Sequence, residues 1–420
     1  MSTSGVSSLQ AQVEGLFAAD PDLLADPFPV WDQLRTERPV WRLDDVVILS
    51  RHTDVRELLA DNNVLYSRAA TRHSARYTRA AARFQPASAA AFDRVLDQEF
   101  GQLVRMDPPD HPRVRKVVMP PFSARKLARE MEAKVAARVS ENLDRLDTGD
   151  DVVDFKRFAY TLPLEVLGDV LGIPLDDLDR VHSWAHKIAE NKLNADSESM
   201  AVDADVAYQE LIGYIERLVG RQCRSGATTG LIAALLEAEA AGQISHDELT
   251  GMVALMIFAG HETTSNLIAV GMLELLRERA QWDKLCARPE LVGPAVEELL
   301  RFVTPAHFLQ YVAATSRELG GEMIAEGDTV IGVLAAANRD PDVFAHPSRL
   351  DIERPDSRHH VSLGLGPHFC LGAGLARMEA TALFGAMVRR HPGVALTDGE
   401  LMWGGRSLRT PLTLPLILRR

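Results

Sequence analysis

Cys370 is the residue whose neighbours point most directly to chemistry. Of the three cysteines in the chain, it is the one set among glycines with a nearby histidine, in Leu363-Gly-Leu-Gly-Pro-His-Phe-Cys-Leu-Gly372. Such glycines let the backbone turn tightly and approach a flat ligand closely. Apolar residues then recur at helical spacing from Leu371 to Arg390. This predicts that Cys370 lies at a helix N-terminus, where the helix dipole and nearby amides lower the pKa of a thiol.

A thiolate at this position could be a nucleophile, a redox thiol or a metal ligand. His368 is near enough in sequence to be considered as a base, but the sequence does not fix its geometry. A redox pair needs a second cysteine nearby and zinc needs further ligands at set spacing, and the segment has neither. The loop also lacks the third glycine of a dinucleotide-binding turn. One thiolate suffices where a cofactor supplies the remaining ligands, as haem does. The other cysteines, Cys223 and Cys286, are expected to be inert.

The segment resembles the haem-binding loop of the cytochrome P-450 family, Phe-Gly-x-Gly-x-His-x-Cys-x-Gly. Every fixed position matches except the first, where this chain has leucine, which is apolar but lacks the aromatic ring. The resemblance implies that Cys370 is the axial ligand to the iron of haem b. It also implies that the other fixed positions contact the cofactor: Leu363, Gly364, Gly366, His368 and Gly372.

A second motif lies on the longest predicted helix. The capping box Ser245-His-Asp-Glu248 predicts where that helix starts, and the pattern continues without proline to about Arg277. Within it, Ala259-Gly-His-Glu-Thr-Thr264 resembles the oxygen-activation motif of the family. The resemblance implies that Glu262 and Thr263 are the catalytic acid–alcohol pair, and an acid beside a hydroxyl suits a proton relay. Gly260 removes a side chain mid-helix and so leaves room for dioxygen.

A third motif, Glu298-Leu-Leu-Arg301, resembles the structural Glu-x-x-Arg pair of the family. Residues three apart share one face of a helix and can form an ion pair. The family joins a further arginine to this pair, and the corresponding residue here is Arg354.

A fourth motif concerns the haem propionates. Asp107-Pro-Pro-Asp-His-Pro-Arg-Val-Arg115 resembles the family segment in which a histidine and an arginine, here His111 and Arg115, hold a propionate through charge-assisted bonds. His368 has the corresponding role in the Cys370 loop. A further propionate arginine is usual in the strand after the Glu-x-x-Arg helix, and that position is Tyr311 here. Tyrosine offers one neutral hydrogen bond and no charge, and the sequence does not show what replaces the missing cation.

Helical patterns dominate the remaining chain. Helices are predicted over 124–146 and over 162–171, the latter closed by Gly172, and strands over 46–49, 329–334 and 412–418. The resemblance runs from about Pro27 to Leu414. It implies a single triangular, mainly helical fold with minor sheets, with the haem between the long central helix and the Cys-ligand helix. We therefore expect an N-terminal tail over 1–26 and one catalytic domain over 27–420.

Composition narrows the class of protein. The 420 residues include 46 Lys and Arg against 59 Asp and Glu, a net charge of −13, which argues against nucleic-acid binding. The sequence shows no signal peptide and no apolar run of about 20 residues, so we expect a cytoplasmic protein without a membrane partner. A row of arginines at helical spacing is interpreted first as a solvated face and alternatively as a wall for an acidic substrate or partner: Arg72, Arg76, Arg79 and Arg83.

The resemblance also implies an activity and a partner. The expected protein is a haem-thiolate monooxygenase that activates dioxygen with two electrons from outside, since the chain carries no flavin or iron–sulfur motif. Those electrons come ultimately from NAD(P)H through a small ferredoxin. The ferredoxin is expected to dock on a basic patch on the thiolate side: Arg113, Lys116, Arg125, Lys126 and Arg129.

The substrate is expected to be a medium-sized organic molecule of the natural-product kind. Candidate contacts lie where the family varies most, although each aromatic is also explained as plain core: Phe92, Leu255, Phe258, Ala259, Ala306, Phe308, Met402 and Trp403. One alternative is oxidative C–C or C–N coupling, or ring closure, on the same haem. An alternative of another class is a haem-binding protein without turnover, which the acid–alcohol pair disfavours.

Overall fold

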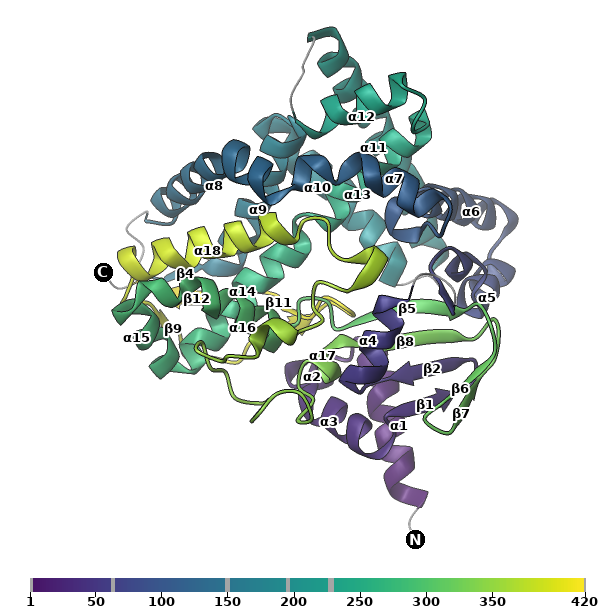
Figure 1. The fold of residues 1–420 in the computed structure, drawn as a ribbon, viewed down its shortest axis with the longest axis horizontal. Coiled ribbons are helices and arrows are strands. Elements are labelled where there is room, and N and C mark those ends of the chain that lie inside the picture. The colour runs from purple at the N-terminus through teal and green to yellow at the C-terminus, as the bar shows by residue number, and fades with distance from the viewer. Residues whose placement is uncertain (1–2, 62–64, 148–151, 194–196, 226–229, 419–420) are drawn as a thin grey trace.

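The computed structural model describes residues 3–61, 65–147, 152–193, 197–225 and 230–418. The chain is mainly helical, and Figure 1 shows a roughly triangular outline with a small sheet at the lower right. The helices that surround the candidate site are α7 (Asp110–Val118), α8 (Ala124–Leu146), α9 (Phe155–Leu171), α13 (His246–Ala259), α14 (Glu262–Arg277), α16 (Val292–Val303) and α18 (Ala373–Arg390). The helix predicted over 124–146 is confirmed.

The main sheet lies beside the helical part (Figure 1). Its strands, in spatial order, are β1 (Val40–Leu43), β2 (Val46–Leu49), β8 (Thr329–Val333), β5 (Phe308–Ala313) and β3 (Tyr66–Ser67). The β2–β8 pair is parallel and the other pairs are antiparallel. The described residues form three smaller sheets. One contains β4 (Val152–Asp154), β9 (Ala395–Leu396) and β12 (Pro415–Ile417), the second β10 (Trp403–Gly404) with β11 (Thr410–Pro411), and the third β6 (Arg317–Leu319) with β7 (Glu322–Ile324). The strand predicted over 412–418 is therefore shorter than expected.

Helix α9 begins earlier than the sequence predicted. Asp154 caps it by accepting a hydrogen bond from the Lys156 N–H at 3.0 Å, and the helix continues through Pro163. It ends as predicted at Gly172, whose φ of 70° lies in the left-handed region that glycine adopts at little cost.

The long helix expected from Ser245 to about Arg277 is interrupted. The capping box at its start is present, with the Glu248 N–H bonded to Ser245 Oγ at 3.1 Å. The helix then breaks at Gly260 and His261, which separate α13 from α14. A Cβ on Gly260 would lie 2.6 Å from the Met256 carbonyl oxygen, so the close turn at this point requires glycine.

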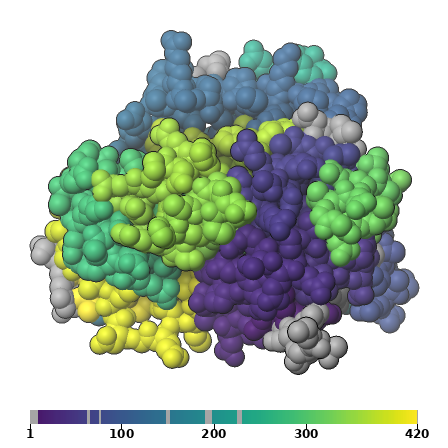
Figure 2. Space-filling model, turned by 60° about the horizontal axis from the view of Figure 1, so that its bottom comes forward, coloured from purple at the N-terminus to yellow at the C-terminus, as the bar shows by residue number. Residues whose placement is uncertain are grey.

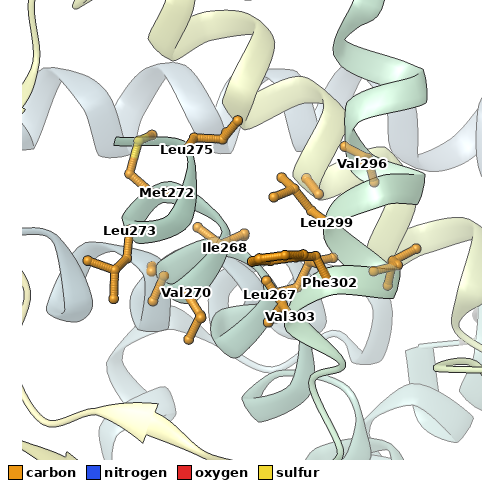
Figure 3. Packing of buried hydrophobic residues seen from close by; sticks show 14 of the residues in the cluster. Leu267, Ile268, Val270, Met272, Leu273, Leu275, Val296, Leu299, Phe302 and Val303 are labelled. Carbon is orange, nitrogen blue, oxygen red and sulfur yellow. The ribbon is translucent and has the colours of Figure 1, made fainter. Parts of the chain in front are cut away.

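The two halves of the broken helix belong to different hydrophobic clusters. Residues of α14 pack with α16, α18 and α8 in the first core, and Figure 3 shows the α14 side chains Leu267, Ile268 and Leu275 facing Leu299 and Phe302 of α16. Residues of α13 pack in the second core with α10 (Leu175–Leu193), α11 (Glu198–Ser225) and α12 (Leu231–Ala240). The break therefore lies where the two cores meet.

The N-terminal residues expected to be a tail are part of the folded unit. Residues 3–17 form α1 (Thr3–Phe17) and residues 21–25 form α2 (Pro21–Ala25). Leu9, Val13 and Leu16 are buried in the first core, and Phe17 packs edge-on against Phe308 with ring centroids 5.0 Å apart. In Figure 2 the N-terminal part, in purple, forms a broad area of the face next to the later segments in yellow-green.

The longest apolar helical stretch of the described chain is largely buried in the protein core. Among the described residues, residues 246–277, taken as one helix, are long and apolar enough to cross a bilayer. Helices α9 and α10 would be a second candidate only if the pair, which is bent by 109°, were counted as one span. Of the most apolar window in 246–277, 72% is buried inside the protein. The apolar surface of this helix is therefore covered by protein.

Leu16→Ala tests whether the N-terminal helix belongs to the domain. Removing most of a side chain that is 2% exposed should lower the free energy of unfolding by about 2–4 kcal/mol. The exposed Glu14→Ala, on the same helix, should change it by less than about 0.5 kcal/mol. Urea unfolding of both variants measures the difference, and equal stabilities would show that α1 does not pack on the core in solution.

Candidate active site

Cys370 lies in a tight loop just before α18. Its N–H donates to the Leu363 carbonyl at 2.8 Å, which closes the loop on itself. Gly364 and Gly366 have φ values of 69° and 60°, and a Cβ on Gly366 would come within 3.0 Å of the Ala60 backbone at the end of α4 (His52–Ala60). The glycines are therefore needed for the turn and for its close contact with α4.

The expected low pKa of Cys370 is not seen in the protein alone. Burial raises the pKa of the Cys370 thiol above its usual value, and the Gly372 N–H and the charges of Arg115 and Arg377 only partly oppose this effect. Desolvation therefore outweighs the hydrogen bond and the two positive charges on the free thiol. A coordinated metal ion would reverse the balance, since it deprotonates the thiol that binds it.

A largely apolar cavity opens in front of Cys370. It lies between the Cys370 loop and the break in the long helix, and its walls come from α7, α9, α13, α14 and α18. The predicted site residues on its wall are His111, Arg115, Leu255, Ala259, Gly260, Thr263, His368, Cys370 and Gly372. A Cβ on Gly372 would meet no atom within 4 Å, so this glycine leaves the space beside the thiol open.

The break in the helix presents Thr263 to this cavity. The Thr263 hydroxyl donates to the Ala259 carbonyl at 3.1 Å, one turn back across the break. Glu262 lies on the first turn of α14. Burial first, and then the Glu262 charge, raises the pKa of Tyr160, and the same charge opposes the lowering of the Lys156 pKa by burial. The carboxylate therefore acts on α9, while the neighbouring hydroxyl lines the cavity.

Tyr160 and His261 fix the geometry of the break. His261 is fully buried, with Nδ1 2.9 Å from the Ile257 carbonyl and Nε2 2.6 Å from the Tyr160 hydroxyl. The Tyr160 hydroxyl also contacts His182 Nδ1 of α10. Burial lowers the pKa of His261 to about 4, so the imidazole is neutral near pH 7. These bonds tie the break to α9 and α10, a contact that the sequence did not suggest.

Basic side chains gather at one edge of the cavity. The rings of His111 and His368 lie 4.1 Å apart between centroids, and the Nε2 atoms of both are buried with no hydrogen-bond partner in the structure. Arg115 Nη2 donates to the Phe369 carbonyl at 2.5 Å. Burial first, and then neighbouring positive charge, lowers the pKa of His368 to about 3. Buried polar atoms without partners indicate a missing acceptor at this edge.

The position expected to hold a further propionate arginine is Tyr311. It is 3% exposed, on β5, and the guanidinium of Arg68 lies 4.6 Å above its ring. Arg68 was not among the residues suggested by the sequence. Because it lies 243 positions from Tyr311 along the chain, only the tertiary fold reveals the contact.

The structural motif forms a buried ion network. Both carboxylate oxygens of Glu298 are 2.8 Å from Arg301 nitrogens, and Glu298 Oε1 is also 3.0 Å from Arg354 Nε. The side chains of Glu298 and Arg301 are fully buried. This network brings together the three residues named from the sequence.

Six of the eight candidate substrate contacts lie away from the cavity wall. Phe92 packs with Tyr77 and Phe84, Phe258 with Tyr208, and Phe308 with Phe17. The Trp403 ring lies 3.4 Å below the Arg409 guanidinium, Met402 is 68% exposed, and Ala306 is half-buried before β5. Those aromatic residues serve packing, whereas Leu103, Val104 and Met256 line the cavity and were missed.

The two groups of basic residues also differ from expectation. Arg72 lies in the short helix η1 (Ala69–His73) and pairs with Asp97 at 2.6 Å. Arg79 and Arg83 lie on the next helix, α5 (Ala75–Arg83). The Arg76 side chain is outside the described part of the chain. The row is therefore not one helix face. In the basic patch, Arg113 is bonded to Asp110 and Glu248, and Arg129 is bonded to Glu130, which leaves Lys116, Arg125 and Lys126 without an ion pair among the described residues.

Comparisons with known proteins agree with this geometry. A sequence profile of the cytochrome P-450 family matches residues 64–287 and 279–392. The vitamin D(3) 25-hydroxylase of Pseudonocardia autotrophica is 34% identical over 404 residues, covering 93% of this chain and 94% of the relative. The chain belongs to the cytochrome P-450 family. It is therefore an oxidoreductase of the monooxygenase type.

Two solved cytochromes P-450 match almost the whole chain. The crystal structure of CalO2 superposes with a TM-score of 0.85 at 30% identity and covers 95% of this chain and 98% of CalO2. CxnD, a cytochrome P-450 for C–S bond formation in chuangxinmycin biosynthesis, has a TM-score of 0.82 at 30% identity and covers 93% and 94%. The predicted mainly helical fold with minor sheets is confirmed.

The family implies haem, and the residues present fit it. Among the described residues, no group of three or more His, Cys, Asp or Glu side chains could hold a metal ion by itself. The open space at Gly372, the apolar walls and the unpartnered Nε2 atoms of His111 and His368 suit a flat apolar ring with carboxylates at one edge.

Cys370→Ser tests the axial ligand. The variant should lose the thiolate–carbonyl absorption band of the reduced protein, because a serine hydroxyl is not ionised as the thiol is. Cys286→Ser is the matched control and should keep the band, since burial raises the pKa of the Cys286 thiol and no role is assigned to it. Retention of the band in Cys370→Ser would remove Cys370 as the ligand.

Proposed function

We propose that this cytochrome P-450 hydroxylates a medium-sized, largely apolar natural product. The observation that carries the proposal is the apolar cavity that joins Cys370 to Thr263. When bound, haem supplies the activation of dioxygen, with two electrons and two protons consumed per turnover. Cys370 would hold the iron, and His111, Arg115 and His368 would bind the carboxylates at the basic edge.

The protein supplies protons and excludes water. The Thr263 hydroxyl, 3.1 Å from the Ala259 carbonyl, can turn from that acceptor and donate its proton into the cavity. Glu262 is the neighbouring acid that can return a proton to it. The break at Gly260 and His261 lies between this hydroxyl and its acceptor, because Ala259 ends α13 and Thr263 is in the first turn of α14.

The cavity walls favour an apolar substrate over a charged one. Leu103, Val104, Leu255, Met256 and Ala259 contribute only apolar side chains to the wall. The relative from Pseudonocardia autotrophica is named for a similarly apolar substrate, vitamin D(3). Burying such surfaces stabilises binding by about 25 cal/mol per Å² of apolar area.

A second candidate reaction is oxidative bond formation without net oxygen insertion. The observation that favours it is the likeness to CxnD, which is named for C–S bond formation. Product mass separates the two reactions, because hydroxylation adds one oxygen atom and coupling removes two hydrogen atoms. Mass spectrometry of products from a library of apolar natural products, with reductase, ferredoxin and NADPH, makes this test.

For the electron supply we propose a small acidic ferredoxin in the cytoplasm. Phe369, beside Cys370, is 38% exposed, and Met119 at the end of α7 is 51% exposed. Lys116, Arg125, Lys126 and Arg129 lie on α7 and on the first turns of α8. An apolar centre with a basic rim suits an acidic partner.

Thr263→Ala tests the proton relay. The variant should bind haem normally but release more of its electrons as hydrogen peroxide, because the proton donor at the cavity is gone. The measurement is the ratio of product formed to NADPH consumed. Thr264→Ser, at the adjacent cavity-lining hydroxyl, is the matched comparison and should retain coupling; unchanged coupling in Thr263→Ala would remove Thr263 from the relay.

Lys126→Glu tests the docking face. Reversing this charge should slow electron transfer from ferredoxin severalfold at low salt and make the rate less dependent on salt, because steering by opposite charges is weakened. Stopped-flow reduction under carbon monoxide measures the rate. The control is Lys187→Glu on α10, which makes the same charge change on a helix remote from Cys370 along the chain and should leave the rate unchanged. Equal rates in both variants would move the docking site elsewhere.

A further inference from the structure

Arg68 is a buried arginine held in place from several sides. It follows β3 directly and is 6% exposed. Its Nε donates to the Val104 carbonyl at 3.2 Å and its Nη1 to the Gln310 carbonyl at 3.1 Å. Its backbone N–H donates to Asp107 Oδ1 at 3.0 Å, and Ser67 Oγ contacts the same carboxylate. The side chain therefore has one well-defined position.

No carboxylate neutralises this guanidinium. Among the residues that the structure describes, Arg68 forms no salt bridge, and its side-chain partners are two carbonyl oxygens and the face of Tyr311. Burial lowers its pKa and the nearby Arg105 cation adds to this effect, while Tyr311 and the Asp107 carboxylate oppose it only in part. A buried charge without a counter-ion is strongly unfavourable, so the fold holds a place for an anion.

The surroundings of Arg68 locate that anion at the basic edge of the cavity. Asp107, whose carboxylate accepts the Arg68 N–H at 3.0 Å, also accepts the His111 N–H on its carbonyl at 3.0 Å, so Arg68 is bound to the first turn of α7. The His111 ring lies 4.1 Å from the His368 ring, and both line the cavity together with Arg115. Val104, which accepts from Arg68, is itself on the cavity wall. Arg68 therefore lies behind the wall at Val104, next to the edge where Arg115 and the unpartnered Nε2 atoms of His111 and His368 line the cavity.

We propose that Arg68 supplies a cation for a haem propionate and thereby replaces the arginine that the family usually carries at position 311. Tyr311 has become the surface on which this guanidinium stacks, 4.6 Å from its ring. The cation is delivered from the segment after β3 instead of from β5. The inference rests on haem occupying the cavity, which the family implies, and not on any particular substrate or reaction.

The test compares two substitutions that differ in charge. Arg68→Gln keeps a donor for the Val104 or Gln310 carbonyl and removes the charge, whereas Arg68→Lys keeps the charge. Haem transfer from the purified holoenzyme to excess apomyoglobin, followed in the Soret region, should be about tenfold faster or more for Arg68→Gln and close to wild type for Arg68→Lys. The reduction potential of Arg68→Gln should also fall, because an uncompensated propionate favours the ferric state.

Matched variants separate a propionate contact from a packing role. Arg72→Gln, in the same segment but paired with Asp97, should lose haem at the wild-type rate. Adding Tyr311→Arg to Arg68→Gln should restore slow haem loss, since it returns a cation to the usual family position. Equal haem loss in the Gln and Lys variants, or no rescue by Tyr311→Arg, would overturn the proposal. Because haem loss needs no substrate, the result stands apart from the proposed hydroxylation.

Discussion

One buried carboxylate, that of Glu298, holds the segment on which the site depends. The Glu298 carboxylate accepts hydrogen bonds from Arg301, from Arg354 and from the Asp351 N–H. The guanidiniums of these two arginines also donate to backbone carbonyls of one segment: Asn338, Ala345, His346, Pro347 and Arg349. The stretch from Asn338 to Asp356 consists of turns, so its carbonyls need partners outside any helix or strand. Ion pairing and these carbonyl bonds together offset the cost of burying three charges. Because this stretch leads into the Cys370 loop, the network determines where the thiol can lie.

The cavity combines two environments that suit the two parts of one cofactor. Its walls toward α9 and α13 are apolar, while the edge formed by His111, Arg115 and His368 is cationic or polar. Such a separation orients a flat amphipathic group in one way, since the opposite orientation would leave the cation without an anion and place carboxylates against leucine. Thr263 and Cys370 both lie on the wall of this cavity.

Local patterns predicted much of this arrangement. The ends of α8, the capping box at Ser245, the Cys370 loop and the Glu298–Arg301 pair follow from residues close together in sequence, where propensity and spacing decide the outcome. The sequence did not predict the break at Gly260 and His261, because a glycine in an apolar helix is compatible with either a continuous or an interrupted series of backbone hydrogen bonds. The packing of the N-terminal helices and the position of Arg68 depend on partners far along the chain. Periodicity carries no information about such partners.

The location of the helix break has a mechanical consequence. α13 is anchored in the second core with α10 and α11, and α14 in the first core with α16 and α18. A continuous helix would connect the two cores rigidly. Interrupted backbone hydrogen bonds instead allow one core to rotate relative to the other at the break. That point carries Thr263 and Ala259, whose hydrogen bond spans it. A displacement of one core against the other would therefore change the distance between these two residues and, with it, the position of the Thr263 hydroxyl.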